Sequence, residues 1–320
     1  MDSLALIFIV VAVSDSYALA GALSAVASIV ISIANPFWSR LADRIGQRKM
    51  LIRVVPMKII GLSLFIALVM NGAPVWTWFV SIILAELAAI NTGGLVRRRW
   101  LHVLSPDKST TAEDETDKHV VNTAYSYEAL MDEVVFIVGP ITATACATSI
   151  APAAGLIAGM ILMSIGLPLF AMQRATEPPP SPVRVKDPHP PVIGIPIVQA
   201  IALATTFTGG FFGAISITVV GFAESQGAKS YSGLLLGIWA SGSAVMAIIN
   251  GLIKWKTPYV GRFLIFLTAL TTLSIPFIFV DSIFWLAIAL FFNGFAIAPL
   301  IVNAYGVVQE VVPSEQITES

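Results

Sequence analysis

Residues 134–173 read VVFIVGPITATACATSIAPAAGLIAGMILMSIGLPLFAMQ, a run of 40 residues without a charged side chain. An α-helix rises 1.5 Å per residue, so about 20 apolar residues cross the ~30 Å hydrocarbon core of a membrane. The run is therefore long enough for two membrane-spanning helices. Its only polar, turn-like stretch is Thr148–Pro152, which predicts that the two helices are joined there.

The rest of the chain has the same character. Hydrophobic residues make up 57% of the 320 residues and charged residues only 12%, whereas soluble domains have about 25% charged residues. We therefore expect an all-α fold, a polytopic membrane helix bundle of about ten transmembrane helices. The predicted spans lie near residues 3–13, 16–39, 54–71, 74–96, 121–148, 151–172, 194–223, 230–252, 260–280 and 283–306.

Positive charges alternate between the two sides of this predicted bundle. Sixteen of the 18 Lys and Arg residues lie around the connections that follow the second, fourth, sixth and eighth spans, and the intervening turns contain only Lys229. Loops that stay in the cytoplasm retain Lys and Arg. The pattern predicts a multi-pass protein of the inner (plasma) membrane, with its basic loops and both chain termini in the cytoplasm.

A proline-rich segment divides the predicted spans into six and four. Residues 174–192 read RATEPPPSPVRVKDPHPPV, with seven prolines that remove backbone donors and fix φ. We expect an extended, semi-rigid cytoplasmic linker here. It separates an N-terminal helix bundle, residues 1–173, from a C-terminal bundle, residues 193–320.

The connection between the second and third spans carries a distinctive motif. Residues 39–51 read SRLADRIGQRKML, and one interpretation is a cytoplasmic anchor in which Gly46 provides the chain reversal. The stretch also resembles the signature loop of the major facilitator superfamily, G-x-L-A-D-R-x-G-R-K/R-x-x-L. It departs from that pattern at Ser39 and Gln47. The resemblance implies that this loop is a conformational switch, with Asp43, Arg44, Gly46, Arg48 and Lys49 as its residues.

The resemblance covers nearly the whole chain, and the motifs are most similar to permeases of actinobacterial type. It implies two six-helix halves around a central cavity that opens alternately to each side of the membrane. In the family, the acid equivalent to Asp43 faces the eleventh helix and a cation at the end of the fourth, for which Arg97 is the candidate. Family members normally have twelve helices, so we expect a chain truncated at both ends.

A second motif lies in the predicted fifth span. Gly139-Pro140 is similar to the core of the fifth-helix motif of the family's proton-linked exporters, although residues 141–144 replace its later glycines. A Gly-Pro pair removes a backbone hydrogen bond and permits close helix approach. We expect a kink or pivot at this point; the alternative is a packing kink without a role in gating.

Four acidic residues inside predicted spans are candidate proton or substrate sites: Glu86, Glu128, Asp132 and Glu133. An acid costs about 2.5–3.5 kcal/mol at the centre of a membrane helix on insertion scales. Glu86, near the middle of the fourth span, is the best single candidate; the alternative is a hydrogen bond between helices. Glu128 and Asp132 share a helix face, and the alternative for this group is neutralisation by an arginine of residues 97–99.

Two further groups of polar residues in the spans are expected to be structural. Lys58, early in the third span, is expected to snorkel to the inner membrane interface. Asn250, Asn293 and Asn303 are expected to bridge helices.

Several classes of function are disfavoured by what the sequence lacks. The net charge of −1 and the absence of a basic aromatic patch argue against nucleic acid binding. One cysteine and three loop histidines, His102, His119 and His189, do not make a metal site, and no phosphate-binding loop for ATP is found. We expect no cofactor and no metal.

The sequence therefore predicts a secondary active transporter that uses the proton gradient to export a small solute by alternating access, as an efflux antiporter. Its expected partners are the solute, protons and the lipid bilayer, and no oligomer is required. The alternative is a truncated, non-transporting remnant of the family. An intramembrane enzyme would need paired His, Asp or Ser groups at matching depth, and the spans provide none.

Overall fold

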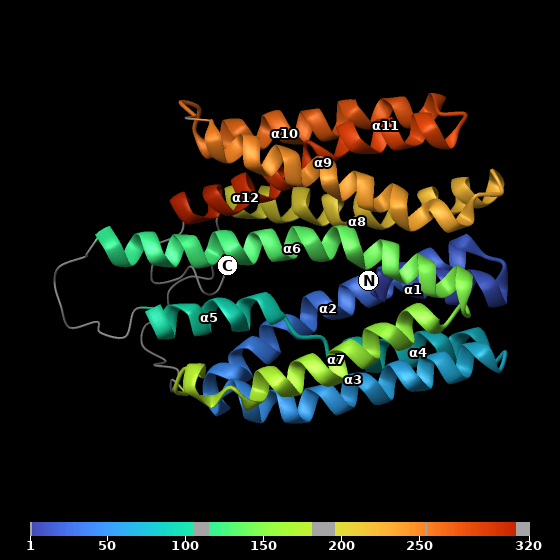
Figure 1. Cartoon of the computed structure of the whole chain (residues 1–320), viewed down its shortest axis with the longest axis horizontal. Helices are drawn as coiled ribbons and strands as arrows, with labels where there is room; N and C mark the ends of the chain where they lie inside the picture. The colour runs from blue at the N-terminus through green and yellow to red at the C-terminus, as the bar shows by residue number, and fades with distance from the viewer. Residues whose placement is uncertain (1, 105–114, 181–195, 254, 312–320) are drawn as a thin grey trace. The chain divides into compact units, whose positions relative to one another are not determined.

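A computed structural model describes residues 2–104, 115–180, 196–253 and 255–311 of the chain. Helices account for most of these residues, and no β-strand occurs among them. In chain order the elements are α1 (Asp2–Ser14), α2 (Tyr17–Ile45), α3 (Gln47–Met70), α4 (Val75–Glu86), α5 (Thr92–Leu104), α6 (Glu115–Ser149), α7 (Ala154–Met172), η1 (Arg174–Thr176), α8 (Pro196–Ser225), η3 (Lys229–Tyr231), α9 (Ser232–Leu252), α10 (Tyr259–Ser274), η4 (Ile275–Phe279), α11 (Ile283–Gly294) and α12 (Ile297–Val311) (Figure 1).

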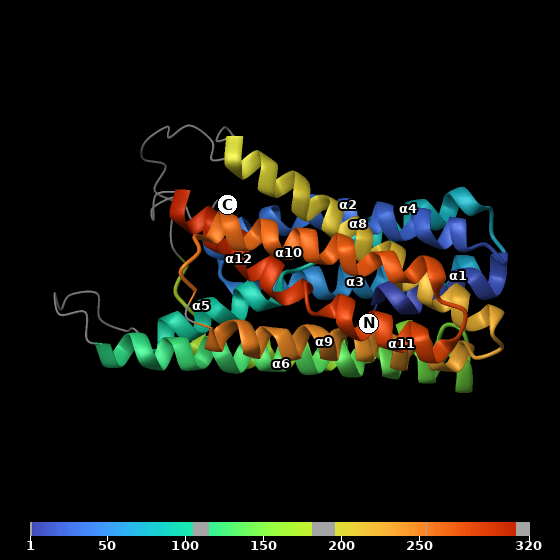
Figure 2. The ribbon, with the colours of Figure 1, turned by 90° about the horizontal axis from the view of Figure 1, so that it is seen from above.

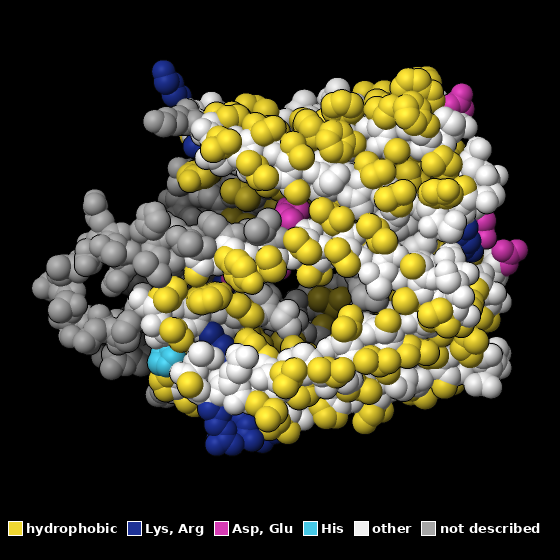
Figure 3. Space-filling view, in the orientation of Figure 1, with side chains coloured by type: hydrophobic (Ala, Val, Ile, Leu, Met, Phe, Trp, Pro, Cys, Tyr) yellow, Lys and Arg dark blue, Asp and Glu magenta, His cyan; other side chains and the backbone are white. Residues whose placement is uncertain are grey.

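The all-α membrane fold predicted from the sequence is confirmed. Within the described residues, eight helical segments are long and apolar enough to cross a membrane, and α1 and α4 are shorter apolar helices. Hydrophobic side chains cover most of the face shown in Figure 3, whereas most of the Lys, Arg, Asp and Glu side chains visible there lie near the ends of the helices. Hydrocarbon is the solvent that suits such a surface, because its side chains are apolar and an α-helix forms most of its backbone hydrogen bonds within itself.

Two predicted spans are not continuous helices. The fourth, expected over residues 74–96, is divided into α4 and α5 by residues 87–91. The tenth, expected over 283–306, is divided into α11 and α12 at residues 295–296, and the chain changes direction there (Figures 1 and 2). In the first break, Asn91 Oδ1 accepts a hydrogen bond from Gly94 N at 3.1 Å, which caps the start of α5. A hydropathy pattern does not predict that a helix ends and a new one begins within an apolar block.

The chain divides into two compact units. Unit 1 comprises Met1–Val134 and Ala145–Val185, and unit 2 comprises Val135–Thr144 and Lys186–Ser320. Helix α6 therefore contributes to both, because its middle part packs within unit 2. Of the proline-rich segment 174–192, the structure describes residues 174–180, which begin with the short helix η1; the rest of the expected linker lies outside the described residues.

Helix α1 is enclosed within unit 1. Its residues 4–11, LALIFIVV, are all buried, and the helix packs against α2, α3 and α7. A helix that is apolar on every side is stable where other helices surround it. The short first span of the sequence is thus an internal element of unit 1.

Close approach of α9 and α11 organises unit 2. A Cβ atom built on Gly242 would overlap the carbonyl oxygen of Phe291, and one built on Gly294 would overlap the carbonyl oxygen of Trp239. Glycine at these two positions therefore allows the backbones to lie closer than a larger residue would permit.

Asn293 bridges helices, as predicted. Its Oδ1 accepts a hydrogen bond from Trp239 Nε1 at 2.9 Å, and its Nδ2 donates to Ser274 Oγ at 3.0 Å. It thereby joins α9, α10 and α11. The same prediction is wrong for Asn303, whose Nδ2 donates to Pro299 O of its own helix at 2.7 Å. Asn250 Oδ1 is buried and has no hydrogen-bond partner within the described parts of the chain.

We predict that Gly242→Val lowers the stability of the protein, because the new side chain must displace the backbone of α11. Overpacking of this kind costs about 1–3 kcal/mol. The matched control is Gly251→Val in the same helix, where a Cβ atom meets nothing within 4 Å. Thermal unfolding of the detergent-purified protein is the measurement, and equal melting temperatures for the two variants would contradict the packing argument.

Candidate functional site

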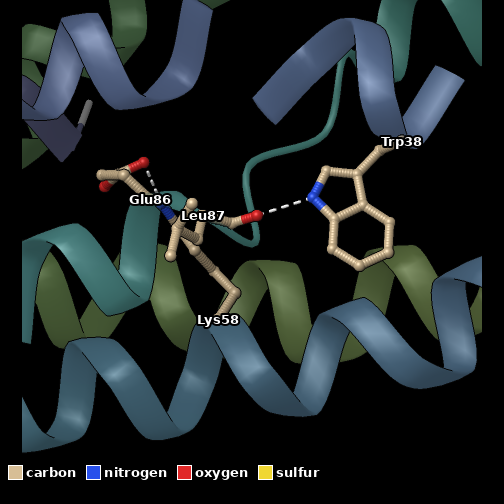
Figure 4. Close-up of polar contacts among 4 residues, drawn as sticks. All are labelled: Trp38, Lys58, Glu86 and Leu87. Carbon is tan, nitrogen blue, oxygen red and sulfur yellow. Dashed lines mark hydrogen bonds and ion pairs between the residues drawn. The ribbon is translucent and has the colours of Figure 1, made fainter. Parts of the chain in front are cut away.

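A buried ion pair lies at mid-depth in unit 1. Lys58 Nζ of α3 donates to Glu86 Oε2 of α4 at 2.5 Å, and the two side chains are only 8% and 7% exposed (Figure 4). Lys58 lies about 16 Å along α3 from Gln47, and Glu86 lies about 16 Å along α4 from Val75. Both distances are about half of the ~30 Å hydrocarbon thickness. The expectation that Lys58 snorkels to the interface is therefore wrong; its ammonium is held inside by Glu86.

A glycine brings the two helices of this pair together. A Cβ atom on Gly61 would lie 2.6 Å from the Cα atom of Ala85, closer than real Cβ contacts. Gly61 is one helical turn from Lys58, and Ala85 precedes Glu86. The close approach of the two backbones therefore places the ammonium and the carboxylate within hydrogen-bond distance.

The break in the fourth span begins directly after Glu86. Leu87 N and Ala88 N still donate to carbonyls of α4, and the chain then leaves the helix until Thr92. The Leu87 carbonyl accepts a hydrogen bond from Trp38 Nε1 of α2 at 2.6 Å, as Figure 4 shows. A backbone group released by the break is thus satisfied by a neighbouring helix, as a membrane interior requires.

The acids of α6 have different surroundings. Glu128 is buried, and its Oε1 accepts a hydrogen bond from Arg97 Nε at 3.0 Å. Its Oε2 is buried with no hydrogen-bond partner among the residues that the structure describes. Asp132 is exposed and Glu133 is half-buried. The ion pair with Arg97 agrees with the alternative interpretation for Glu128, neutralisation by an arginine.

The start of α5 contributes to the environment of Glu128. A Cβ atom on Gly93 would lie 3.4 Å from Glu128 Oε1, so the carboxylate lies beside the first turn of α5. The N-terminal end of a helix carries a partial positive charge. Arg97 lies one turn further along α5, so two sources of positive charge lie beside the Glu128 carboxylate.

Asp43 of the signature loop pairs with an unexpected arginine. Its carboxylate forms an ion pair with Arg98, while the expected partner, Arg97, contacts Glu128. Successive residues of an α-helix point about 100° apart, so Arg97 and Arg98 face different neighbours. Asp43 and Arg98 are each more than one third exposed, and the pair lies at the surface of unit 1.

The third arginine of this series anchors the end of α7. Arg99 is 5% exposed; its Nη1 donates to Phe170 O at 2.8 Å and Gln173 O at 3.1 Å, and its Nε donates to Gln47 Oε1 at 2.8 Å. The guanidinium also lies 3.6 Å from the centre of the Phe170 ring. Burial lowers the pKa of Arg99, while the charge of Glu177 opposes that shift. Sequence reasoning missed Arg99, because three adjacent arginines carry no signal of which one is buried.

The segment after α7 caps the signature loop. Glu177 Oε1 accepts a hydrogen bond from Arg48 N at 2.9 Å, and so fills the capping position at the start of α3 that Gly46 cannot fill. Gly46 has a φ of +92°, a conformation that favours glycine. The other cations of this loop, Arg40, Arg44 and Lys49, are exposed.

Comparison with known proteins places this geometry in a family. The sequence model described as Major Facilitator Superfamily matches residues 2–319. The chain belongs to the major facilitator superfamily. A comparison with curated proteins found no match. The superfamily consists of secondary transporters, so the chain is a multi-pass membrane protein of a transporter family and not of an enzyme family.

The fifth-helix motif of this superfamily member lies inside α6. Pro140 is within the helix, which continues to Ser149 and changes direction along its length in Figure 1. A Cβ atom on Gly233 of α9 would overlap the Pro140 carbonyl oxygen and lie 2.7 Å from Thr144 Cβ. The Gly-Pro pair therefore lies at a close helix contact within unit 2, and Gly139 is buried.

The series of three arginines provides its own controls. We predict that Arg99→Ala lowers stability strongly, because each buried group left unpaired costs about 1–3 kcal/mol. Arg98→Ala removes a partly exposed ion pair, for which about 0–1 kcal/mol is expected. Thermal unfolding in detergent measures both variants. A larger loss for Arg98→Ala than for Arg99→Ala would overturn the assignment of Arg99 as the anchor.

Proposed function

We propose that the chain exports a small solute in exchange for protons, by alternating access, with Glu86 as the group that both occupy in turn. Membership of a secondary transporter superfamily supports transport in general. The observation that carries the finer proposal is the buried Lys58–Glu86 pair at mid-depth beside a helix break. Transporter sites near the midplane are typically formed where a membrane helix is discontinuous.

Exchange follows from competition at one carboxylate. A proton on Glu86 and a solute bound to Glu86 exclude one another, and either releases the Lys58 ammonium from its partner. If the site faces each side of the membrane alternately, protons that enter down their gradient drive the solute out. Glu128 is a second candidate proton site, because one of its buried oxygens has no hydrogen-bond partner among the described residues. Asp132 and Glu133, which follow Glu128 on α6, are further candidate proton sites.

Two features are proposed to serve the conformational change. The signature loop is proposed to act as a switch. It is linked to α5 by the Asp43–Arg98 ion pair, and Glu177 caps the helix α3 that follows it. Gly139-Pro140 is proposed as a pivot, because proline interrupts the backbone hydrogen bonds of α6.

The chain is proposed to lie in the plasma membrane with its basic loops and both termini in the cytoplasm. Lys49, in the first turn of α3, and Asn71, directly after its last residue, are both exposed, so they test this orientation. In a Cys146→Ala background, a membrane-impermeant maleimide added to intact cells is expected to label Asn71→Cys. Lys49→Cys is expected to react only in permeabilised cells. The opposite labelling pattern would reverse the topology.

Transport itself is tested in proteoliposomes preloaded in turn with a labelled amine, sugar or carboxylate and given an inwardly directed proton gradient. We expect at least one solute to leave faster with the gradient, and Glu86→Gln to reduce this exit at least about tenfold, or about 1.4 kcal/mol in the barrier. Glu224→Gln, at an exposed carboxylate near the end of α8, is the matched control.

Three outcomes are informative. Gradient-driven exit that survives Glu86→Gln would remove Glu86 from the exchange and direct attention to Glu128. Exit without any response to the gradient would contradict proton coupling. No exit of any solute from vesicles that contain correctly folded protein would favour the alternative of a non-transporting member of the superfamily.

A further inference from the structure

The surroundings of Glu86 carry negative charge from two sources. The first is the carboxylate itself, which is buried. The second is the C-terminal end of α4, because Glu86 is the last residue of that 12-residue helix, and a helix C-terminus carries a partial negative charge. Both sources favour a cation. An anion bound in this position would have to face the end of the α4 dipole and separate Lys58 from its carboxylate.

The Lys58 side chain already occupies this site, and its chemistry is that of the cation which the site would select. The Lys58 side chain is a primary ammonium on a four-carbon stem, and its Nζ contacts Glu86 Oε2 at 2.5 Å. The neighbours Val54, Val55 and Leu62 on α3 are buried apolar residues. Lys58 thus shows how an alkylammonium ion is accommodated here, with its charge on the carboxylate and its stem among apolar side chains.

This occupant is held by few polar contacts. An ammonium group has three N–H donors, and one hydrogen bond, to Glu86, is found for Lys58 among the described residues. A competing ammonium that takes the same carboxylate therefore has one hydrogen bond to replace. An inorganic cation such as Na⁺ would need several oxygen ligands, and the Ala85, Glu86 and Leu87 carbonyls nearby already accept hydrogen bonds.

The break after α4 offers a way to reach the carboxylate. Leu87 is 39% exposed although Glu86 beside it is buried. The segment from Ala89 to Asn91 is not helical, and one hydrogen bond from Trp38 ties the Leu87 carbonyl to α2. Displacement of this segment would open Glu86 without unwinding α4. Figure 4 shows Trp38 and Lys58 on different sides of this segment.

We propose that Glu86 and the end of α4 form a binding site for an alkylammonium cation, which Lys58 occupies as a tethered competitor in the state described here. Proton, solute and Lys58 then compete for one carboxylate. That the exported solute is this cation rests on the proposed function. Binding of the cation at Glu86 is independent of the proposed function.

The test removes the competitor and supplies its chemistry from solution. Lys58→Met in the full chain keeps an unbranched side chain and removes the Lys58 ammonium from the buried Glu86 carboxylate, which lowers the melting temperature. We expect n-butylammonium chloride to raise the melting temperature of this variant in detergent, in a saturable manner. The Kd is expected to be at least about tenfold lower than for wild type, because the internal competitor is gone.

Matched probes define the chemistry of the response. n-Butanol has the same apolar chain without the charge, sodium butyrate has the opposite charge, and sodium chloride supplies an inorganic cation. The double variant Lys58→Met/Glu86→Gln has no charge at the site and is expected to lose the response to butylammonium. Should Lys58→Met fail to fold, calorimetric titration of butylammonium into wild type and into the double variant decides the question, with measurable binding expected for wild type alone.

Several results would overturn the proposal. They are an equal response to n-butanol, a response to sodium ions or to butyrate but not to butylammonium, or binding that persists in the double variant. Because binding is measured in detergent without a gradient, it is independent of the vesicle assay. Proton-driven exit of a sugar or a carboxylate without ammonium binding would leave the proposed function standing and refute this site.

Discussion

The free energy of an unpaired charge in a low-dielectric interior determines how unit 1 is built. A buried ion that loses its partner costs about 3–5 kcal/mol, so an acid at mid-depth on α4 requires a cation at the same depth on a neighbouring helix. Lys58 supplies it for Glu86, and Arg97 supplies it for Glu128. Arg99 donates hydrogen bonds from Nη1 to the carbonyls of Phe170 and Gln173 at the end of α7, and the charge of Glu177 acts on it as well. Each arrangement ties two helices together.

Small residues set the distances over which these polar contacts operate. Gly61 lies against the backbone of Ala85, and this contact brings α3 and α4 close enough for a short ion pair. Within unit 2, Gly233 against Pro140 and Gly242 against Phe291 do the same for helices that carry few charges. In a membrane, helices gain little from mutual exclusion of water, so close van der Waals contact and hydrogen bonds between helices provide much of their association energy.

The same constraint connects stability with transport. In the proposed function Glu86 exchanges Lys58 for a proton or a solute, so the segment beside it has to move. Glu86 lies where α4 ends, and the carbonyl of the next residue, Leu87, accepts a hydrogen bond from Trp38 of α2. Several hydrogen bonds hold Arg99 in place, whereas the proposed movement beside the Lys58–Glu86 pair would have to break the hydrogen bond from Trp38 to the Leu87 carbonyl.

The sequence alone determined the fold class and the approximate positions of most spans, because runs of apolar residues are a local property. It also drew attention to Glu86, since an acid inside an apolar block stands out by itself. It could not reveal that Lys58 is its partner, that α4 ends at Glu86, or which of three successive arginines contacts Asp43. Those facts depend on helix rotation and on the close approach of α3 to α4. Both are set by packing between segments distant in sequence, which hydropathy does not encode.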